Sequence, residues 1–300
     1  MNHLRIGCIK DLKTSRELWK ALSPIECVYD TWEFRESLYN HDLFELFFYA
    51  AYDGEEPVAL LPLQYNTDEN YLEFFGGGYT EDNRILVKKG YESATVQLLK
   101  SLDRPATLFL MNECPNGSLY KCAIDEYKYF ADISQCKTID DYIAMAFRGK
   151  SKKNRIREMR ILKESADIQI RPSTDGDMDL LVDLNISNLG NASDFADVDG
   201  KKLLRDLFNA QCGAVGLSVV VNGNVEGVTI AFFAGSTYTY FNAGVNKMTY
   251  ANLGKYLIFA NIEMAISLGA KTFDAGPEDL GWKEMFGLTK KPLFCVTIPQ

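Results

Sequence analysis

The densest concentration of chemically active side chains in this sequence is a run of cations near its middle. The segment Arg148–Lys163 (RGKSKKNRIREMRILK) holds eight basic residues and one acid, although the chain of 300 residues has a net charge of −9. Cations in the first turn of a helix oppose its macrodipole, and a bound anion would offset that cost. We therefore expect Lys152, Lys153 and Arg155 to bind an anionic group such as phosphate. The alternative is a solvated face that pairs with the excess acid of the same chain.

The apolar residues of the basic segment predict its conformation. Ile156, Met159 and Leu162 recur at three-residue spacing. This spacing indicates a helix that begins near Ser151 and buries one apolar stripe. The basic side chains would then crowd the start of that helix.

Other kinds of site are disfavoured by composition. Only two histidines, His3 and His41, are present. A histidine-rich metal site or a Ser-His-Asp triad is therefore hard to build, and we expect no bound metal. The glycine run at 76–78 lacks the Lys-Ser/Thr continuation of a nucleotide loop. The cysteines show no regular spacing, which is typical of reduced thiols in a cytosol: Cys8, Cys27, Cys114, Cys122, Cys136, Cys212 and Cys295.

Charge and hydropathy narrow the class of protein. The acidic net charge argues against general affinity for nucleic acid. No stretch approaches the ~18–20 apolar residues that a membrane helix requires. The first residues (MNHLRIGCIKDLKTSREL) also lack the apolar core of a secretory signal. An apolar content of 47% is enough for one or two sizeable cores. We therefore expect a soluble, cytoplasmic protein.

The elements that must position any site recur along the chain, beginning with two hairpins. Phe48–Leu63 and Leu217–Phe232 are both apolar runs broken by a polar residue and a glycine, at Asp53 and Asn222 respectively. Such pairs tolerate positive φ at both central positions of a tight turn. Each run is therefore predicted to form a β-hairpin.

The order of elements after each hairpin also matches. A third strand ending in glycine follows, then an amphipathic helix, then another apolar strand. In the first half these are Tyr71–Gly77, Gly90–Leu102 and Ala106–Met111, and in the second half they are Tyr238–Gly244, Ala251–Leu268 and Lys271–Ala275. The repetition predicts two tandem domains, residues 1–135 and 136–300. The fold class would be α/β, with mixed, largely antiparallel sheets flanked by helices.

Three further segments carry predictions of their own. Tyr29–Tyr39 is an aromatic-rich connection whose large rings we expect to be core. Thr138 is predicted to cap a helix that ends at Phe147. The polar and acidic run 185–200 has the composition of a loop, either over a site or on the surface.

The C-terminal half resembles a known superfamily at specific motifs. The sequences VEGVTIAFFAGSTYTYFNAGVN and YANLGKYLIFANIEMAISLGAKTFDAGPEDLGWKEMFG supply a strand pair, a glycine-bearing entry to a long helix, the strand GAKTFDAG and the motif WKEMFG. These features resemble the GNAT acyltransferase superfamily. Within it they look most like the tandem branch of Fem-type aminoacyltransferases and FemAB-like acetyltransferases, in which a basic segment before the second core is typical. The resemblance covers most of residues 138–300 and, more weakly, residues 25–135.

The resemblance implies a donor site for acyl-CoA, such as acetyl-CoA. In the superfamily, backbone amides at a helix start hold the pyrophosphate in a gap between two strands. The implied donor-binding residues of this chain are Thr249, Asn252, Leu253, Gly254 and Lys255. Of the glycine-rich loop pattern only Gly254 survives. The alternative is that Asn252 merely caps the helix and Gly254 permits close packing.

The resemblance also implies where acyl transfer would take place. Asp274 at a strand end is the implied base, with Tyr240 and Lys283 as further catalytic candidates. Asn242 and Trp282 are implied to contact the substrate. Trp282 stands where the superfamily often has a tyrosine acid, and an indole cannot shuttle a proton. Structural alternatives are strand termination for Asp274, core packing for Tyr240 and a surface charge for Lys283.

Three functions remain open on these grounds. The first is an N-acyltransferase that moves an acyl group from acyl-CoA to an amine on a small molecule, sugar or peptide. The second is a Fem-type aminoacyltransferase that uses charged tRNA, with Arg148–Lys163 on phosphates. The acidic net charge and the absence of a heptad-patterned coiled-coil arm count against it. The third is a non-catalytic module that retains the fold.

Overall fold

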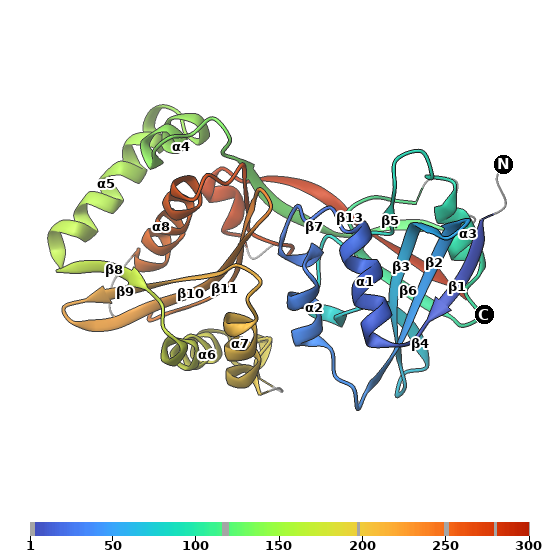
Figure 1. Ribbon diagram of the computed structural model, residues 1–300. Coiled ribbons are helices and arrows are strands. Elements are labelled where there is room, and N and C mark those ends of the chain that lie inside the picture. The colour runs from blue at the N-terminus through green and yellow to red at the C-terminus, as the bar shows by residue number, and fades with distance from the viewer. Residues whose placement is uncertain (1–3, 116–119, 197–198, 249–251, 279–280, 300) are drawn as a thin grey trace. The chain divides into compact units, whose positions relative to one another are not determined.

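The computed structural model describes residues 4–115, 120–196, 199–248, 252–278 and 281–299. The chain divides into two compact units. Unit 1 comprises residues 1–25, 29–128 and 291–300, and unit 2 comprises residues 26–28 and 129–290. Each unit has its own helices around a sheet (Figure 1). Within the described ranges, no helix is long and apolar enough to cross a membrane.

Unit 1 is built on a mixed sheet with the strand order β1-β2-β3-β4-β6-β13-β7, and β5 lies beside β3. Its strands are β1 (Arg5–Ile9), β2 (Phe44–Asp53), β3 (Glu56–Asn66), β4 (Tyr71–Phe74), β5 (Leu86–Val87), β6 (Ala106–Met111), β7 (Cys122–Asp132) and β13 (Thr289–Ile298). Its helices are α1 (Leu12–Leu22), α2 (Trp32–Leu38) and α3 (Ala94–Lys100). Strands β1 to β4 are antiparallel, whereas β4 and β6 are parallel.

Both faces of the unit 1 sheet are buried. Along β2, Phe47 and Tyr49 join the core that contains α3, while Leu46 and Phe48 join the core that contains α1 and α2. This alternation follows from the two-residue period of a strand. A sheet covered on both sides explains why β2 and β3 are apolar almost throughout.

Unit 2 has the strand order β7-β12-β11-β10-β9-β8. Its strands besides β7 are β8 (Ile168–Pro172), β9 (Ala214–Val221), β10 (Asn224–Ala234), β11 (Thr237–Val245) and β12 (Thr272–Asp274). Its helices are α4 (Ile139–Ala146), α5 (Gly149–Ser165), α6 (Asp175–Leu189), α7 (Gly200–Asn209) and α8 (Leu253–Ser267). A 3-10 turn, η4, covers Lys283–Phe286.

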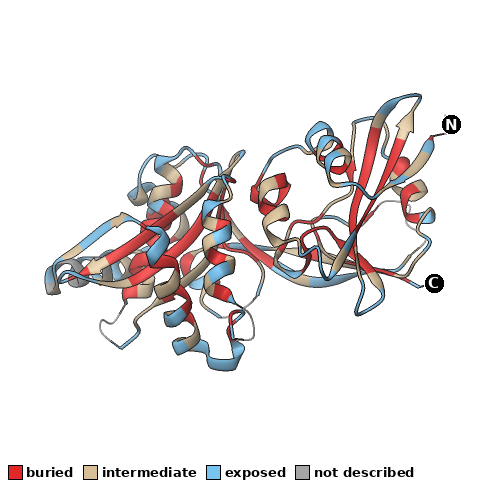
Figure 2. Cartoon of the chain, turned by 60° about the horizontal axis from the view of Figure 1, so that its bottom comes forward, coloured by how far each residue is buried: buried red, intermediate tan, exposed pale blue. Residues whose placement is uncertain are grey.

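Helices cover both faces of the unit 2 sheet as well. In Figure 1, α6 and α7 lie on one side of β9 to β11, and α8 lies on the other side with α4 and α5. Figure 2 colours much of these strands as buried. Helix α8 is fixed to the sheet by a buried amide, since Asn261 accepts hydrogen bonds from Tyr238 (2.7 Å) and Thr229 (3.2 Å).

The predicted repetition of elements is confirmed. Each unit runs through a strand, two helices, three antiparallel strands, a helix and a parallel strand. The sequence did not predict β13, the last strand. In unit 1, β13 pairs antiparallel with β6, with Val296 opposite Leu108. In unit 2, β7 pairs antiparallel with β12, with Ala131 opposite Phe273. The last strand of the chain therefore completes the first unit.

The predicted local signals have mixed outcomes. Thr138 caps α4 as expected, because its hydroxyl accepts from the Asp141 N–H (3.2 Å) and the Asp141 carboxylate accepts from the Thr138 N–H (2.9 Å). The second hairpin has the expected turn, with φ of 49° at Asn222 and 85° at Gly223. The first hairpin differs, since Asp53 pairs with Glu56 inside the strands and the turn consists of residues 54 and 55.

Besides the turn of the first hairpin, four expectations from sequence were wrong. The segment Tyr29–Tyr39 is mainly helical, as α2, although its large rings are core as predicted, with Trp32 stacked on Phe75 at 5.0 Å. The run 185–200 is not all loop, because α6 continues to Leu189 and ends with a hydrogen bond from the Gly190 N–H to the Ile186 carbonyl. The cysteines are not all reduced thiols, since Cys114 and Cys122 form a disulfide. Finally, Ile156 of α5 is 44% exposed and is not part of a buried stripe, while the Met159 and Leu162 side chains lie outside the described part of the chain.

Candidate functional site

The candidate site lies in unit 2, where two parallel strands part. β11 pairs with β12 only through Thr237, Tyr238 and Thr239, and β12 ends opposite Thr239 at Asp274. Within the described part of the chain, no strand pairs with the remainder of β11, residues 240–245, on that side. Unpaired backbone along a strand is a natural place for a ligand to hydrogen-bond. The gap is the feature that the superfamily resemblance implied.

A β-bulge re-aims the side chains at the start of this gap. In the β10–β11 register, Ile230 faces Asn242 and Ala231 faces Tyr240, so Phe241 is the extra residue. An extra residue shifts the alternation of a strand by one position. Tyr240 therefore packs in the core on the α8 side, whereas Asn242 bonds to α6.

Asparagine side chains of α6 hydrogen-bond to two backbone carbonyls on the unpaired edge of β11. The Asn246 N–H donates to the Glu226 carbonyl on β10. In an antiparallel pair, successive residues direct their N–H and carbonyl groups alternately toward and away from the partner strand, so those of Ala243 and Val245 point away from β10. The Ala243 carbonyl accepts from the Asn185 amide at 3.2 Å. The Val245 carbonyl accepts from the Asn188 amide at 2.7 Å. A ligand that bonds to these two carbonyls must share them with the two α6 side chains or displace those side chains.

Helix α6 is seated tightly against β11. A Cβ placed on Gly244 would come within 2.4 Å of the Leu181 carbonyl oxygen, so only glycine permits this approach. At the start of α6, the Asp177 carboxylate accepts two bonds from Arg171 (2.6 and 2.9 Å) and one from the Thr174 N–H (2.7 Å). The bonds from Arg171 are the main reason that the pKa of Asp177 lies well below its usual range. The helix that carries the edge asparagines is therefore anchored at its N-terminal end.

The start of α8 has the features of an anion site. Its N-cap residue, Asn252, has a left-handed backbone (φ 69°) and makes no side-chain cap bond. The first N–H groups of the helix are therefore not satisfied by a capping side chain, unlike those of α6. A Cβ added at Gly254 would meet no atom within 4 Å, whereas Leu253 is buried in the core. Thr249, the other predicted loop position, lies outside the described residues.

The basic helix α5 is partly neutralised by contacts within unit 2. Glu158 accepts from Arg155 at 2.8 Å and from Lys255 of α8 at 3.2 Å. Two of the predicted binding cations therefore share an internal carboxylate. Lys152 is half-buried and Lys153 is exposed. Lys153 is thus the more accessible of these two lysines.

Asp274 and Lys283 both bond to the backbone of Gly276. The Asp274 Oδ1 accepts from the Gly276 N–H at 3.0 Å, and the Lys283 Nζ donates to the Gly276 carbonyl at 3.0 Å. Lys283 also donates to the Pro277 carbonyl. Both side chains are almost completely buried. This arrangement holds the turn after β12 and gives each charged group a backbone partner.

Tyr240 and Trp282 lie against each other beside that turn. Their ring centroids are 6.3 Å apart with an edge-on geometry, and Tyr240 is 9% exposed. No described residue hydrogen-bonds the Tyr240 hydroxyl. Burial raises the pKa of Tyr240 well above its usual value, so the phenol stays neutral and keeps its proton at physiological pH. A neutral phenol can donate a hydrogen bond.

Thr239 and the edge asparagines are site features that the sequence did not indicate. The Thr239 hydroxyl is fully buried, and within the described residues it has no hydrogen-bond partner. It sits on the last β11 residue that pairs with β12, at the closed end of the gap. A signal for Asn185 and Asn188 was present in the asparagine-rich run after residue 184, but only the folded chain brings that run to β11.

Comparisons with known proteins agree with this geometry. Residues 149–284 match the family model described as the acetyltransferase (GNAT) domain. FemX has a similar structure, with a TM-score of 0.68 and 10% identity over 97% of this chain and 96% of its own. L-PGS from Bacillus licheniformis has a TM-score of 0.61 and 12% identity over 97% and 93% of the two chains. A tandem GNAT protein from the clavulanic acid biosynthesis pathway, solved without AcCoA, has a TM-score of 0.54 and 12% identity over 98% of each chain.

Among curated proteins, none matches this sequence. The matched domain covers the gap, the start of α8 and the turn after β12. The structural likenesses extend over nearly the whole of the chain. Residues 149–284 are therefore a GNAT acetyltransferase domain, and the fold of the chain is of the FemAB-like, tandem type.

Proposed function

We propose that this protein is an N-acyltransferase whose donor binds in unit 2, at the start of α8 and along the gap between β11 and β12. The observation that carries the proposal is that α8 begins without a capping side chain and that part of β11 is not paired with β12. The acceptor would be an amine on a small molecule, a sugar or a peptide. The proposal is for a reaction class, since a fold alone does not specify a substrate.

Acyl-CoA is the donor that the helix start fits best. The N–H groups of residues 253–255 would hold its phosphates, and the open space at Gly254 would let the phosphate approach the backbone. Acyl-CoA would supply a thioester carbonyl for attack by the amine and a thiolate leaving group. Thr239, with its orphaned hydroxyl at the closed end of the gap, offers a donor to a ligand oxygen.

The roles of the remaining side chains follow from their contacts. The neutral Tyr240 phenol can donate a proton or a hydrogen bond as charge develops in acyl transfer. Asp274 and Lys283 act as positioning residues, because Asp274 accepts from the Gly276 N–H and Lys283 donates to the Gly276 carbonyl. The Trp282 ring packs edge-on to Tyr240 and orients it. Direct attack of an amine on a thioester needs little beyond this positioning and a route for one proton.

A second candidate, aminoacyl transfer from charged tRNA, is favoured by one specific observation. The Asn185 and Asn188 side chains occupy carbonyls of the edge along which an extended amide-bearing donor arm would pair. A donor that binds mainly through its phosphates, on α5 and α8, avoids that competition. This reading predicts binding that weakens steeply with salt.

A transfer assay tests the proposal. The protein is incubated with acetyl-CoA and a panel of small amines, amino sugars and peptides, and both the released thiol and the acetylated amine are measured. We expect amine-dependent thiol release that the Gly254→Val variant lacks. Absence of thiol release with every amine, together with amino acid transfer from charged tRNA, would replace the first candidate with the second. Absence of both would leave a non-catalytic module.

A further inference from the structure

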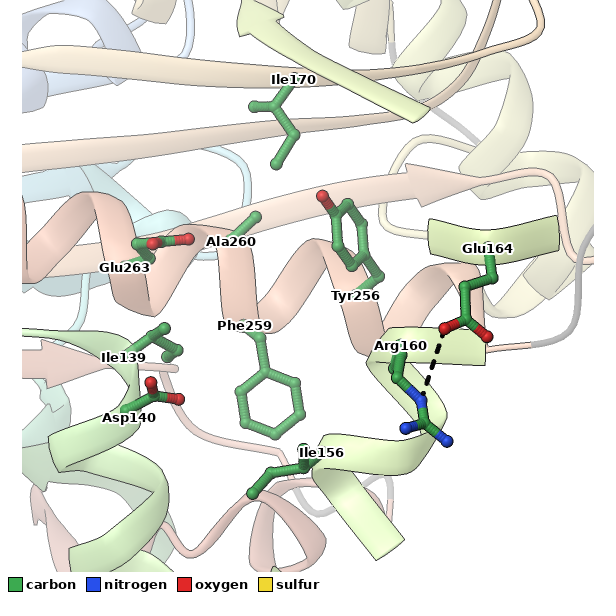
Figure 3. A pocket seen from close by; sticks show the side chains of 10 residues that line it. All are labelled: Ile139, Asp140, Ile156, Arg160, Glu164, Ile170, Tyr256, Phe259, Ala260 and Glu263. Atoms are coloured by element: carbon green, nitrogen blue, oxygen red, sulfur yellow. Dashed lines mark ion pairs between the residues drawn. The ribbon is translucent and has the colours of Figure 1, made fainter. Parts of the chain in front are cut away.

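Unit 2 contains a pocket that belongs to no part of the site described above. It has a volume of about 410 Å³ and is enclosed by α4, α5, β8 and α8 (Figure 3). None of the residues predicted to bind donor or acceptor lines it. Its volume falls in the range of small-molecule sites, ~300–1,000 Å³. The chemistry of its lining therefore indicates what it would hold.

The middle of the pocket is apolar. Phe259 and Ala260 of α8 are buried, and the aliphatic side chains of Ile156 and Ile170 face the space from α5 and β8. Ile156 is 44% exposed and Ile170 is 38% exposed. Large aliphatic side chains that line a hollow and keep this much exposure can still bury area against a ligand. The lining thus fits the hydrocarbon body of a small molecule.

The rim of the pocket carries a net negative charge. Of its four charged residues, Arg160 and Glu164 neutralise each other at 3.6 Å. Asp140 and Glu263 remain, and neither forms an ion pair with any residue in the described ranges. Figure 3 shows Asp140 and Glu263 on one side of Phe259 and the Arg160–Glu164 pair on the other. One end of the pocket therefore presents two uncompensated carboxylates.

The Tyr256 side chain also lines the pocket. Burial, with the charge of Glu263 as a second cause, raises the pKa of its phenol. The carboxylates of Asp140 and Glu263 make the electrostatic potential at their end of the pocket negative, which favours a cation. The Phe259 and Tyr256 rings add faces on which an organic cation can rest.

We propose that this pocket binds a small organic cation, an amine with an alkyl or aryl body. The body would fill the space beside Phe259, Ile156 and Ile170, and the ammonium would lie at the end formed by Asp140 and Glu263. The inference stands independently of the proposed acyl transfer, because no donor or catalytic residue takes part. It assigns the protein a second ligand site of defined chemistry.

Matched probes test the charge requirement. Calorimetric titrations of the whole protein would compare 2-phenylethylamine with 2-phenylethanol, which has the same body and no charge. We expect the amine to bind with a millimolar or lower dissociation constant and at least ~10-fold more tightly than the alcohol. Equal affinities, or no amine binding up to about 10 mM, would overturn the proposal.

Variants at the rim place the binding in this pocket. Glu263→Gln is expected to weaken the amine ~3–10-fold and Glu263→Lys to abolish its binding, with little effect on folding because the side chain is exposed. Glu17→Gln, an exposed acid in unit 1, makes the same change in net charge away from the pocket. Unchanged amine affinity in both Glu263 variants, or equal loss in the Glu17 variant, would contradict the assignment.

Discussion

At the scale of single residues, the candidate site separates side chains that are already engaged from those that are available. Asp274 and Lys283 are bound to the backbone of Gly276, and Arg155 and Lys255 share Glu158. Thr239 and Tyr240 keep hydroxyls without a described partner. The sequence predicted Asp274 as base and Tyr240 as a further catalytic candidate, and we propose Tyr240 as the proton donor.

Removing the Thr239 hydroxyl should lower the rate of acyl transfer without lowering the stability of the fold. We expect Thr239→Val to unfold at the same or a higher temperature, because an unsatisfied buried hydroxyl is replaced by a methyl group, worth about 1 kcal/mol. The rate of acyl transfer should nevertheless fall ~10-fold or more, since a hydrogen bond to the ligand is lost. Thermal unfolding and kcat are the measurements. A variant that is destabilised but fully active would show that the hydroxyl has a structural role only.

The Tyr240 phenol should matter for rate and not for folding. Tyr240→Phe keeps the ring against Trp282 and removes only the hydroxyl. We expect kcat to fall ~10²-fold or more, the usual size of an acid-base contribution, with the melting temperature nearly unchanged. Because burial raises the pKa of Tyr240, activity should not decline through its ionisation between pH 7 and about 10. A phenylalanine variant with wild-type kcat would exclude Tyr240 as the proton donor.

At the scale of elements, the close seating of α6 on β11 sets the shape of the gap. We expect Gly244→Ala to destabilise the fold by about 1–3 kcal/mol, because its Cβ would meet the Leu181 carbonyl oxygen at 2.4 Å. Gly254→Ala is the matched control, since its Cβ meets nothing within 4 Å and a helical Ala is favoured over Gly by ~1 kcal/mol. Denaturant unfolding of both variants measures this. A neutral Gly244→Ala would show that α6 is not closely seated.

The anchor at the start of α6 should make stability depend on pH. The folded-state pKa of Asp177 is lowered chiefly by Arg171, so its contribution is present above the unfolded pKa of about 3.9 and is lost as pH falls through the folded value. We expect Asp177→Asn to cost about 1–3 kcal/mol at pH 7 and progressively less below pH 4. Asp183→Asn, at an exposed pair with Lys201, should cost less than about 1 kcal/mol. A penalty for Asp177→Asn that is independent of pH would contradict this account.

At the scale of the whole molecule, the last strand of the chain completes the first unit. β13 pairs with β6, and Val296 and Ile298 are buried in the unit 1 core. We expect a chain that ends at Lys290 to lose the protection of β6 amides against hydrogen exchange, because two aliphatic side chains worth about 1.5–3 kcal/mol each are removed. A chain that lacks only residue 300 is the control. Unchanged protection of β6 would show that β13 is dispensable.

The duplication and most elements were predictable because they depend on local pattern. The turn of the second hairpin, the Thr138 cap and the alternation of apolar residues each depend on a few neighbouring positions in the sequence. What could not be predicted depends on contacts between distant segments. The pairing of β13 with β6, the bonds of Asn185 and Asn188 to β11 and the internal pairing of Lys255 all join residues remote in sequence. The division at residue 135 remains a prediction.

The measurement that tests the central claim most directly is the calorimetric titration of acetyl-CoA and desulfo-CoA into the wild type, Gly254→Val and Gly176→Val. Both glycines are second residues of a helix with open space around the added Cβ, but α6, which contains Gly176, begins with a satisfied capping box. We predict micromolar binding by the wild type and by Gly176→Val, and its loss in Gly254→Val. No binding at millimolar ligand, or equal binding by Gly254→Val, would contradict a donor site at the start of α8.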